Sequence, residues 1–328
     1  MKVLITGGAG YIGTNLMVHF LKNGHEIVVV DDFVNAKEEY VEKLMKLFKG
    51  KISLYRFDVR DRKKLDLVFK KECVDGVIHL AAKKYVDESV SNPKLYLENN
   101  IDSLNAVLEC MDKNGVNKVL FASSGVVYGS STKDNVLESD EMCPLSPYAE
   151  SKLEGEKILL KWAKSSKYAL ICRFSNPAGA NTEYLLGDDS RYGKKNLIPY
   201  ISEKVLDKEQ LTFNGNNHPT RDGTPVRDYI HIVDMTKIVY KLFTKVNETC
   251  VCNVARGEGK TVLEIMRAFE STLDNNLNYN FKEKREGDAS SITFSTSKLK
   301  SLVEYEYECS LDDIVQSQIL FDKNKKRH

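Results

Sequence analysis

Residues 2–32 read KVLITGGAGYIGTNLMVHFLKNGHEIVVVDD, and this stretch decides the fold. The apolar run Val3–Ile5 ends at a glycine turn, which favours a buried strand. Apolar residues then recur at helical spacing, and a second apolar run, residues 27–30, ends at Asp31. The order strand, glycine turn, helix, strand and acid is typical of a dinucleotide-binding βαβ unit.

The glycines of this stretch predict a phosphate site. Gly8, Gly10 and Gly13 match the spacing G-x-G-x-x-G, and Gly7 extends the pattern. Glycine lets the backbone turn sharply and approach a pyrophosphate, which then lies on the helix N-terminus. At Asp31 a carboxylate can accept from both ribose hydroxyls and would repel a 2′-phosphate, so NAD is favoured over NADP. A plain glycine turn between core strands is the alternative, which the following helix and acid argue against.

Predicted strands alternate with helices over the first half of the chain. Further strands are expected at residues 51–57, 74–80, 116–123 and 168–174. An amphipathic helix is expected at residues 61–71. This alternation predicts an α/β fold, a Rossmann-type doubly wound parallel sheet with right-handed crossovers. Ligands then bind beyond the carboxyl ends of the strands, where Ser124 and Asn176 fall.

The alternation ends after residue 176. Loops rich in Gly, Asp and Lys are expected at residues 181–195 and 214–224, and short helices near residues 234–245, 261–273 and 311–321. We therefore expect two domains: an NAD-binding Rossmann domain over residues 1–175 and a smaller α/β substrate-binding cap over residues 176–328. The cap is expected to be interleaved with the first domain.

Composition excludes several function classes. The chain has 328 residues, 42% of them hydrophobic, which is enough for a sizeable core. Its net charge of +1 argues against nucleic acid or an anionic membrane as a partner. No apolar run is long enough to span a bilayer. Seven scattered cysteines indicate reduced thiols and no metal site, so we expect a cytoplasmic protein. The basic residues 323–328 favour a solvated, frayed end over a targeting patch.

A long helix is predicted from Pro93 to about Asn114. It carries an apolar stripe at spacings of four and three, formed by Leu97, Ile101, Leu104, Leu108 and Met111. Packing on the sheet explains most of such a stripe. A homodimer through helices 93–114 and 148–165 is the alternative that we carry forward, and the spacing does not separate the two.

The segment Tyr148-Ala-Glu-Ser-Lys152 carries the strongest catalytic pattern. Pro147 begins a predicted helix, so Tyr148 and Lys152 lie one turn apart on one face. A free phenol has a pKa near 10, and a nearby ammonium group lowers it towards that of a usable base. Ser124, at a predicted strand end, can hydrogen-bond the reacting hydroxyl and relay its proton to Tyr148.

Other reactive side chains carry weaker signals. Arg227 and Arg285 can anchor a diphosphate, although the sequence alone favours a surface ion pair for each of them. His79 and His231 lie in apolar strand-like surroundings, and we expect core histidines. Cys110 and Cys172 are expected to be small core residues.

Taken together, these motifs resemble the extended short-chain dehydrogenase/reductase family, from Lys2 to about Gln318. The matching segments are GGAGYIG (7–13), VIHLAA (77–82), ENN (98–100), SSGVVYG (123–129), SPYAESK (146–152), SNPAGA (175–180), KNLIPYI (195–201), PTRDGTPVRDYIH (219–231) and REGD (285–288). The last three are the most specific, because they belong to the nucleotide-sugar half of the family's fold.

The resemblance implies a role for each matched position. NAD would be held by Gly7, Gly10, Tyr11, Ile12, Asp31, Asn35, Asp58, Val59, Leu80, Ala81, Lys84, Asn99, Tyr148 and Lys152. Catalysis would rest on Ser124, Tyr148 and Lys152. The UDP-sugar would be held by Lys84, Ser124, Tyr148, Asn176, Asn196, Leu197, Phe213, Arg227, Tyr229, Arg285, Asp288 and Ile292.

Two positions depart from the family pattern. Ser175 stands where an aromatic residue usually lies beside the nicotinamide, which bears on sugar fit. Ile292 stands where enzymes restricted to glucose and galactose tend to carry tyrosine. A smaller wall at Ile292 predicts room for an N-acetyl group at C2, unless Tyr184 or Tyr192 fills the gap.

The activity implied is that of the family's UDP-hexose 4-epimerases, isomerases that convert UDP-galactose to UDP-glucose through a transient 4-keto sugar. A 4,6-dehydratase needs acids just after the strand-end hydroxyl, where this chain has Gly125 and Val126. A UDP-sugar decarboxylase is a further alternative without a supporting feature. A non-catalytic NAD-binding protein would be expected to have lost the Tyr148–Lys152 pair, which is intact.

Overall fold

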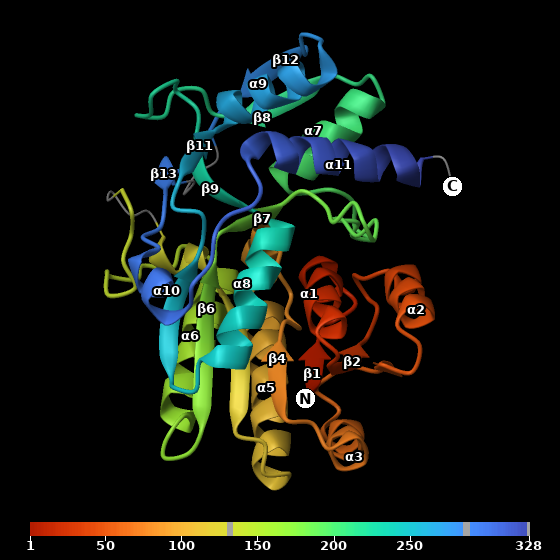
Figure 1. Cartoon of the computed structure of the whole chain (residues 1–328). Coiled ribbons are helices and arrows are strands. Elements are labelled where there is room, and N and C mark those ends of the chain that lie inside the picture. The colour runs from red at the N-terminus through yellow and green to blue at the C-terminus, as the bar shows by residue number, and fades with distance from the viewer. Residues whose placement is uncertain (130–133, 285–288, 327–328) are drawn as a thin grey trace.

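The computed structural model describes residues 1–129, 134–284 and 289–326. Its largest unit is a seven-stranded parallel sheet in the order β10-β6-β5-β4-β1-β2-β3 (Figure 1). Its strands are β1 (Lys2–Thr6), β2 (Glu26–Asp31), β3 (Ile52–Arg56), β4 (Gly76–His79), β5 (Lys118–Ser124), β6 (Tyr168–Phe174) and β10 (Cys250–Val254).

Helices cover both faces of this sheet because the central strands are apolar on both sides. Along β1, Val3 and Ile5 pack into one core cluster and Leu4 into the other. The first cluster takes in α1 (Tyr11–Lys22), α2 (Glu38–Leu47), α8 (Ile232–Lys245) and α10 (Ser297–Leu302). The second takes in α3 (Arg62–Glu72), α5 (Pro93–Lys113) and α6 (Pro147–Trp162).

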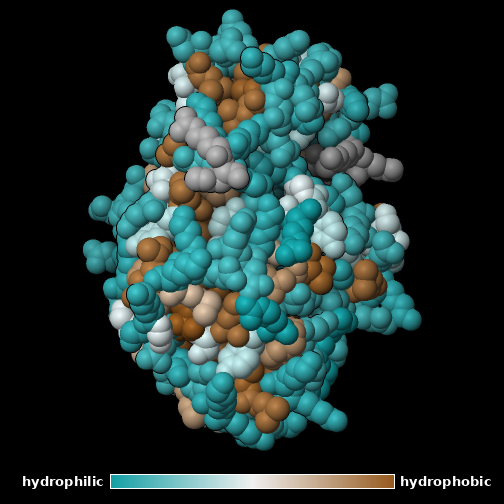
Figure 2. All heavy atoms as spheres, turned by 90° about the vertical axis from the view of Figure 1, so that its right-hand side faces the viewer, coloured by the Kyte–Doolittle hydropathy of each residue, from teal (hydrophilic) through white to brown (hydrophobic). Residues whose placement is uncertain are grey.

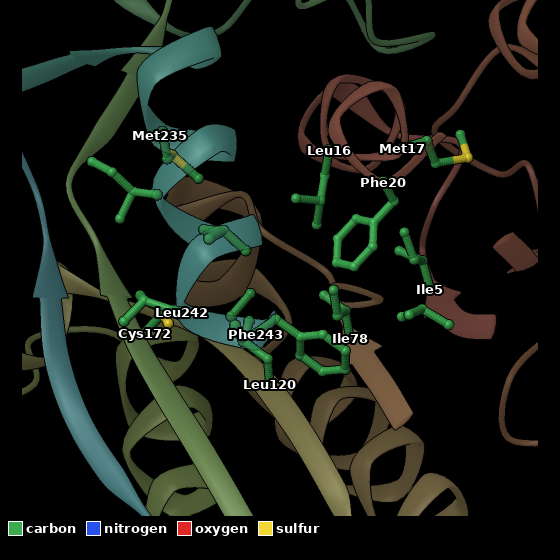
Figure 3. Packing of buried hydrophobic residues seen from close by; sticks show 14 of the residues in the cluster. Ile5, Leu16, Met17, Phe20, Ile78, Leu120, Cys172, Met235, Leu242 and Phe243 are labelled. Carbon is green, nitrogen blue, oxygen red and sulfur yellow. The ribbon is translucent and has the colours of Figure 1, made fainter. Parts of the chain in front are cut away.

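Helices α1 and α8 meet over the middle of the sheet. Figure 3 shows Leu16 and Phe20 of α1 opposite Phe243 of α8, above Ile78 and Leu120. The Phe20 and Phe243 rings meet edge to face, with centroids 5.9 Å apart. Helix α8 thus joins the sheet core although it comes late in the chain.

The cap consists of two small sheets and three helices above the carboxyl edge of the main sheet (Figure 1). In the first sheet, β9 (Val226–His231) pairs with β7 (Asn176–Ala178), β11 (Gly259–Thr261) and β13 (Ser291–Ile292). In the second sheet, β8 (Leu211–Asn214) pairs with β12 (Tyr279–Lys282). The helices are α7 (Leu197–Leu206), α9 (Val262–Leu273) and α11 (Leu311–Lys325). The short helix α4 (Val86–Ser91) and the 3₁₀ turn η1 (Gly125–Tyr128) complete the fold.

Local sequence explains where the cap helices begin. Thr261 and Glu264 form a capping box at α9, and Ser310 and Asp313 form one at α11. Apolar residues of α7, α9 and α11 then pack together with those of β8 and β9 into the cap's own core.

The predicted α/β fold with a parallel sheet is confirmed, and so are the strands expected in the first half and the helix from Pro93. Among the elements that were not predicted are α2, α7 and the edge strand β10. The basic end is solvated as expected, since Lys323, Lys325 and Lys326 are exposed, but the expectation that it is frayed is wrong for residues 323–326. Helix α11 continues through Lys325, which pairs with Asp189, while Lys326 pairs with Asp207.

The surface beside α2 and the C-terminal end of α11 is mostly hydrophilic, with apolar side chains in small patches (Figure 2). Among the described helices, none is both long and apolar enough to cross a bilayer.

Candidate active site

The glycine turn between β1 and α1 leaves an anion site at the helix N-terminus. Gly10 is the N-cap of α1, and no described side chain caps this end. A Cβ on Gly7 would lie 2.6 Å from the amide nitrogen of Ala81, whereas a Cβ on Gly10 would meet only a carbonyl oxygen at 3.4 Å. The first-turn amides, including those of Tyr11 and Ile12, are therefore available, which fits the pyrophosphate of NAD.

Asp31 ends β2 next to this turn. One carboxylate oxygen accepts from the amide of Ala9 at 3.0 Å and the other from the amide of Phe33 at 2.9 Å. Burial raises the pKa of the Asp31 carboxyl to about 6, against these two hydrogen bonds. Each oxygen keeps lone pairs that a ribose hydroxyl can use.

Asn35 and Lys84 lie together beside the turn. Both line one cavity with Gly10 and Tyr11. The Asn35 Oδ1 accepts from the Tyr85 hydroxyl at 3.0 Å. The structure therefore brings these predicted cofactor residues together, and they meet the chemical needs of a dinucleotide diphosphate.

The loop after β4 carries Leu80 and Ala81 and is fixed by a residue that the sequence analysis did not single out. Asn100, buried on α5, accepts from the amide of Lys83 at 2.8 Å and donates to the carbonyl of Lys83 at 3.1 Å. Its half-buried neighbour Asn99 was the predicted cofactor residue. The motif ENN was the available signal, and the structure gives its second asparagine a positioning role.

Asp58 and Val59 follow β3, farther from the turn. The Asp58 carboxylate is engaged by Arg60, whose Nη2 lies 2.5 Å away, and this hydrogen bond lowers the pKa of Asp58. Val59 is buried. A cofactor contact at Asp58 would thus share the carboxylate with Arg60.

Ser124, Tyr148 and Lys152 meet at the carboxyl end of β5. Ser124 is the last residue of that strand, and its hydroxyl hydrogen-bonds Tyr148. Helix α6 begins at Pro147, and the side chain of its N-cap, Ser146, accepts from the amide of Ala149. The Lys152 Nζ lies 5.8 Å from the Tyr148 ring centroid. The expected proximity of the three side chains is therefore present in the structure.

The expected lowering of the Tyr148 pKa by Lys152 is not found. Burial raises the pKa of Tyr148 to about 12, and only the Ser124 hydrogen bond opposes this. The Lys152 ammonium donates instead to the carbonyl of Ala122 at 2.7 Å, and burial lowers its pKa to about 8 although the Glu156 carboxylate raises it. Positive charge from the NAD⁺ nicotinamide would have to favour the phenolate.

A buried ion pair beneath these residues was missed by the sequence analysis. Glu156, one helical turn beyond Lys152, receives Arg173 Nη2 at 2.7 Å, and both side chains are almost fully buried. Arg173 also donates to the Tyr128 hydroxyl at 2.7 Å, and Ser123 donates to Glu156. This network ties α6 to β5 and β6, and the continued i, i+4 spacing from Tyr148 to Glu156 was its only sequence signal.

The predicted sugar-binding residues converge on one strand. In β9, Arg227 pairs with Ile292 of β13, and Tyr229 pairs with Asn176 of β7, in parallel register. Residues two apart in a strand, and partners in a parallel pair, share one face of a sheet. These four side chains therefore belong to the same face of the small sheet.

Asp228 holds the other face of β9. It is 1% exposed, and its carboxylate accepts from the amides of Arg256, Gly257 and Phe294. Burial raises the pKa of Asp228 to about 6, against those three hydrogen bonds. One carboxylate thus pins the loop after β10 and the segment after β13 to the strand that carries Arg227.

The remaining predicted substrate residues lie apart from this face. Asn196 is the N-cap of α7 and donates to Asp188 at 2.7 Å, and Leu197 follows it half-buried. Phe213 is 3% exposed and lies in an aromatic cluster with Tyr200, Tyr279 and Phe281, so its side chain belongs to the cap's core. Arg285 and Asp288 lie outside the described residues.

The structure shows the surroundings of Ser175 and of the two tyrosines considered beside Ile292. Ser175 is buried after β6, and its Oγ has no hydrogen-bond partner in the described ranges. The two tyrosines considered as fillers for Ile292 pack elsewhere: Tyr184 against Phe48 and Tyr192 against Tyr85.

His79, His231, Cys110 and Cys172 lie in the core as expected. His79 Nδ1 pairs with Thr6 Oγ1 at 2.7 Å, and His231 Nδ1 accepts from the amide of Val233 at 3.1 Å. Burial lowers the pKa of His79 to about 3 and that of His231 to about 4. Cys110 and Cys172 are fully buried.

Comparison with known proteins identifies the family of the chain. The sequence profile of the NAD dependent epimerase/dehydratase family matches residues 3–255. The UDP-glucose 4-epimerase of Bacillus subtilis is 36% identical over 320 residues, which are 96% of this chain and 94% of that protein.

Two solved structures extend the likeness to three dimensions. The UDP-glucose 4-epimerase from Bifidobacterium longum, in complex with NAD⁺ and UDP, superposes with a TM-score of 0.94 at 32% identity and covers 99% of both chains. The UDP-Glc/GlcNAc 4-epimerase of Campylobacter jejuni gives 0.84 at 31% identity, over 98% of this chain and 99% of that one. This chain belongs to the NAD dependent epimerase/dehydratase family.

Proposed function

We propose that the protein is an isomerase that inverts C4 of UDP-hexoses, converting UDP-galactose to UDP-glucose. The observation that carries this proposal is the meeting of Ser124, Tyr148 and Lys152 at a strand end between the glycine turn and the cap face of β9. NAD, when bound, supplies the oxidising and reducing power for a transient 4-keto sugar. No net oxidation results, so the cofactor should stay bound through turnover.

The chain's own groups handle the proton and the orientation. Tyr148 takes the proton of the sugar's 4-hydroxyl and returns it, and Ser124 hydrogen-bonds the same oxygen. Lys152 keeps positive charge near the phenol. Gly7, Gly10, Tyr11, Ile12, Asp31, Asn35, Asp58, Val59, Leu80, Ala81, Lys84 and Asn99 would hold NAD.

The cap would hold the UDP moiety and leave the hexose free to turn. Arg227 offers a guanidinium group suited to a diphosphate, on the face that also carries Asn176 and Tyr229. Asn196, Leu197, Phe213, Arg285 and Asp288 complete the proposed set. Firm contacts to UDP with few to the sugar would let either face of C4 approach the cofactor.

The structure disfavours the dehydratase alternative. That reaction needs an acid just after the strand-end hydroxyl, and this position is Gly125. A Cβ on Gly125 would overlap the ring of Phe294, so no side chain fits there without displacing that ring.

We also propose that N-acetylated substrates are accepted. Ile292 is half-buried and packs against the cluster around Val127 and Phe294, next to the turn that follows Ser124. An N-acetyl methyl group would meet an apolar wall there. The Campylobacter jejuni relative, named for both UDP-Glc and GlcNAc, lends support by analogy.

A homodimer through helices α5 and α6 completes the proposal. Leu104, Leu108 and Met111 are buried in the core, so most of the stripe packs on the sheet. Other apolar side chains remain exposed on this side of the molecule: Val90 of α4, Leu95 of α5 and Leu160 of α6 are 63%, 41% and 48% exposed. These side chains favour a partner helix pair, and sedimentation velocity tests the association.

Product analysis tests the proposed function. Purified protein is incubated with UDP-galactose or UDP-N-acetylgalactosamine, without added NAD, and the sugars are separated. We expect UDP-glucose and UDP-N-acetylglucosamine, with NAD in the supernatant of heat-denatured protein. A 4-keto-6-deoxy product would instead favour the dehydratase, and bound NADP would contradict the role of Asp31.

A further inference from the structure

Residues 187–194, which we call the strap, connect the cap to the cofactor half of the molecule. The strap belongs to the segment between β7 and α7 and lies between α11 and the helices α1 and α2 (Figure 1). A Cβ on Gly187, at its start, would overlap the ring of Phe321 on α11. Near its end, Lys194 forms an ion pair with the buried Asp322 of the same helix. The strap is therefore packed against α11 at both ends.

The strap is bonded to residues that we assign to the cofactor site. Ser190 Oγ donates to Asn35 Oδ1 at 2.5 Å, and the amide of Arg191 donates to the carbonyl of Asn35 at 3.1 Å. Arg191 Nε donates to the carbonyl of Ala36 at 2.9 Å. Tyr85 bridges Asn35 and Ser190 through its hydroxyl, at 3.0 and 2.6 Å. Backbone and side chain thus both fix the strap to the segment after β2.

Asp189 fastens the strap to two further parts of the chain. Its carboxylate receives Lys37 Nζ at 2.6 Å and the Tyr40 hydroxyl at 2.7 Å, both from the start of the α2 region. Lys325, at the end of α11, is its third partner. Burial alone would raise the pKa of the Asp189 carboxyl, but the hydrogen bonds with Lys325, Lys37 and Tyr40 lower it.

A buried carboxylate with three partners is a strong local fastening. Its side chain is 4% exposed, so removing its charge would leave two lysines facing a buried position without a counter-ion. Exposed ion pairs on the same surface contribute far less. Asp189 is therefore one of two buried fastenings of the strap, beside the Lys194–Asp322 ion pair, and the one that ties it to the α2 region.

The strap forms one wall of the cavity at the glycine turn. Gly187, Asp188, Asp189 and Ser190 line it opposite Gly10, Tyr11, Thr14, Asn35 and Lys84. Lys84 Nζ lies 4.0 Å from Asp188 Oδ1, so the strap also faces the cation that we assign to the diphosphate. A dinucleotide held on the first-turn amides of α1 would have the strap beside it.

We propose that the strap retains the dinucleotide, with Asp189 as the positioning residue that keeps it closed. This inference rests on the NAD placement of the proposed function, and it adds a segment to which neither motif nor family pattern assigned a role. An enzyme without net oxidation gains by keeping its cofactor between turnovers. Dissociation of NAD would require the contacts of Asp189 to open.

The rate of NAD release tests this proposal directly. Wild type, Asp189→Asn and a control are loaded with NAD, desalted and mixed with an excess of an NAD-consuming enzyme, and the free nucleotide is followed with time. Asp207→Asn is the matched control, because Asp207 pairs with Lys326, the neighbour of Lys325, outside the cavity lining. We expect Asp189→Asn to release NAD at least about 10-fold faster than wild type, and the control to match wild type.

Each other outcome contradicts the proposal. Equal release from Asp189→Asn and wild type would mean that the strap does not limit dissociation, and equal acceleration in Asp207→Asn would assign the effect to the end of α11. Loss of all NAD from the wild-type protein on desalting would also contradict the proposal, because the strap would then retain no cofactor. If Asp189→Asn does not fold, Tyr40→Phe removes one partner only and should still speed release, by about 3-fold.

The measurement is independent of the proposed reaction. Release needs no sugar substrate, so a protein that fails to convert UDP-galactose but shows the expected release rates would refute the epimerase assignment and leave the strap intact. A protein that converts UDP-galactose but does not show the expected release rates would refute only the proposed role of the strap.

Discussion

The cofactor half and the cap hold their site residues by different means. In the cofactor half, the register of parallel strands sets the positions: Asp31 ends β2 and Ser124 ends β5 at the same edge of one parallel sheet. In the cap, buried carboxylates hold loops through backbone amides. Asp228 accepts from three amides, one more than the buried Asp31 of the cofactor half.

This difference predicts where each half is vulnerable. A sheet tolerates the loss of a polar side chain, because its ladder and its core remain. A loop pinned by one carboxylate loses its position when that carboxylate is removed, since the buried amides are left without acceptors. Substitutions of buried acids should therefore damage the cap more than the cofactor half.

The largest effect is expected where the two halves meet. Tyr148→Phe keeps the ring but removes the group that exchanges a proton with the sugar, so turnover should fall at least about 100-fold. Steady-state rates with UDP-galactose measure this. Bound NAD should be unchanged, which serves as the internal control, and a variant with wild-type turnover would refute the assignment.

The next effect is on stability, and it tests the pinning of the cap. Asp228→Ala leaves three buried amides without their acceptor, so the free energy of unfolding should drop by about 2 kcal/mol. Asp31→Ala is the matched variant in the cofactor half, because Asp31 is also buried and its carboxylate accepts from the amides of Ala9 and Phe33. Denaturant unfolding of both variants gives the comparison, and equal losses would break the distinction between the halves.

The substrate-range prediction concerns the face that Asp228 supports. Ile292→Tyr should reduce the specificity constant for UDP-N-acetylgalactosamine about 10-fold more than that for UDP-galactose, because bulk at this wall meets the N-acetyl group. Measuring both constants in wild type and variant gives the ratio. A ratio that does not move would mean that Ile292 does not line the pocket.

The last prediction is a pH dependence of stability. The pKa of Asp228 rises from 3.8 to about 6 in the folded state, so the folded protein binds the extra proton between these values. The stabilising contribution of this proton is present below pH 4 and lost as the pH rises through 6.

Asp228→Asn cannot titrate and tests this dependence. The difference in unfolding free energy, wild type minus variant, should fall by about 2 kcal/mol between pH 4 and pH 7. A difference that rises with pH would show that the carboxylate is ionised more easily when folded.

The same contrast explains what the sequence could predict. The Rossmann half could be predicted because strand length, glycine spacing and the acid at Asp31 are local features of the sequence. The strand β10 was not predicted, because its sequence, Cys250-Val-Cys-Asn-Val254, is short and contains a polar asparagine. It also joins the sheet from a distant part of the chain.

For the site, sequence spacing placed Tyr148, Lys152 and the glycine turn, but it could not show partners distant in the chain. Asp189 joins Lys37 and Lys325 from opposite ends of the chain, and Glu156 meets Arg173 inside the core. The pKa of Tyr148 was misjudged for the same reason: Lys152 bonds to Ala122, and burial outweighs the charge.

The central claim is that the hydrogen removed from C4 is returned to C4 of the same sugar. Purified protein, without added NAD, is given UDP-galactose with deuterium at C4, and the UDP-glucose formed is analysed by mass spectrometry and NMR. We predict that the deuterium remains at C4 in the inverted configuration. Loss of the deuterium to solvent, or no formation of UDP-glucose, would contradict the account.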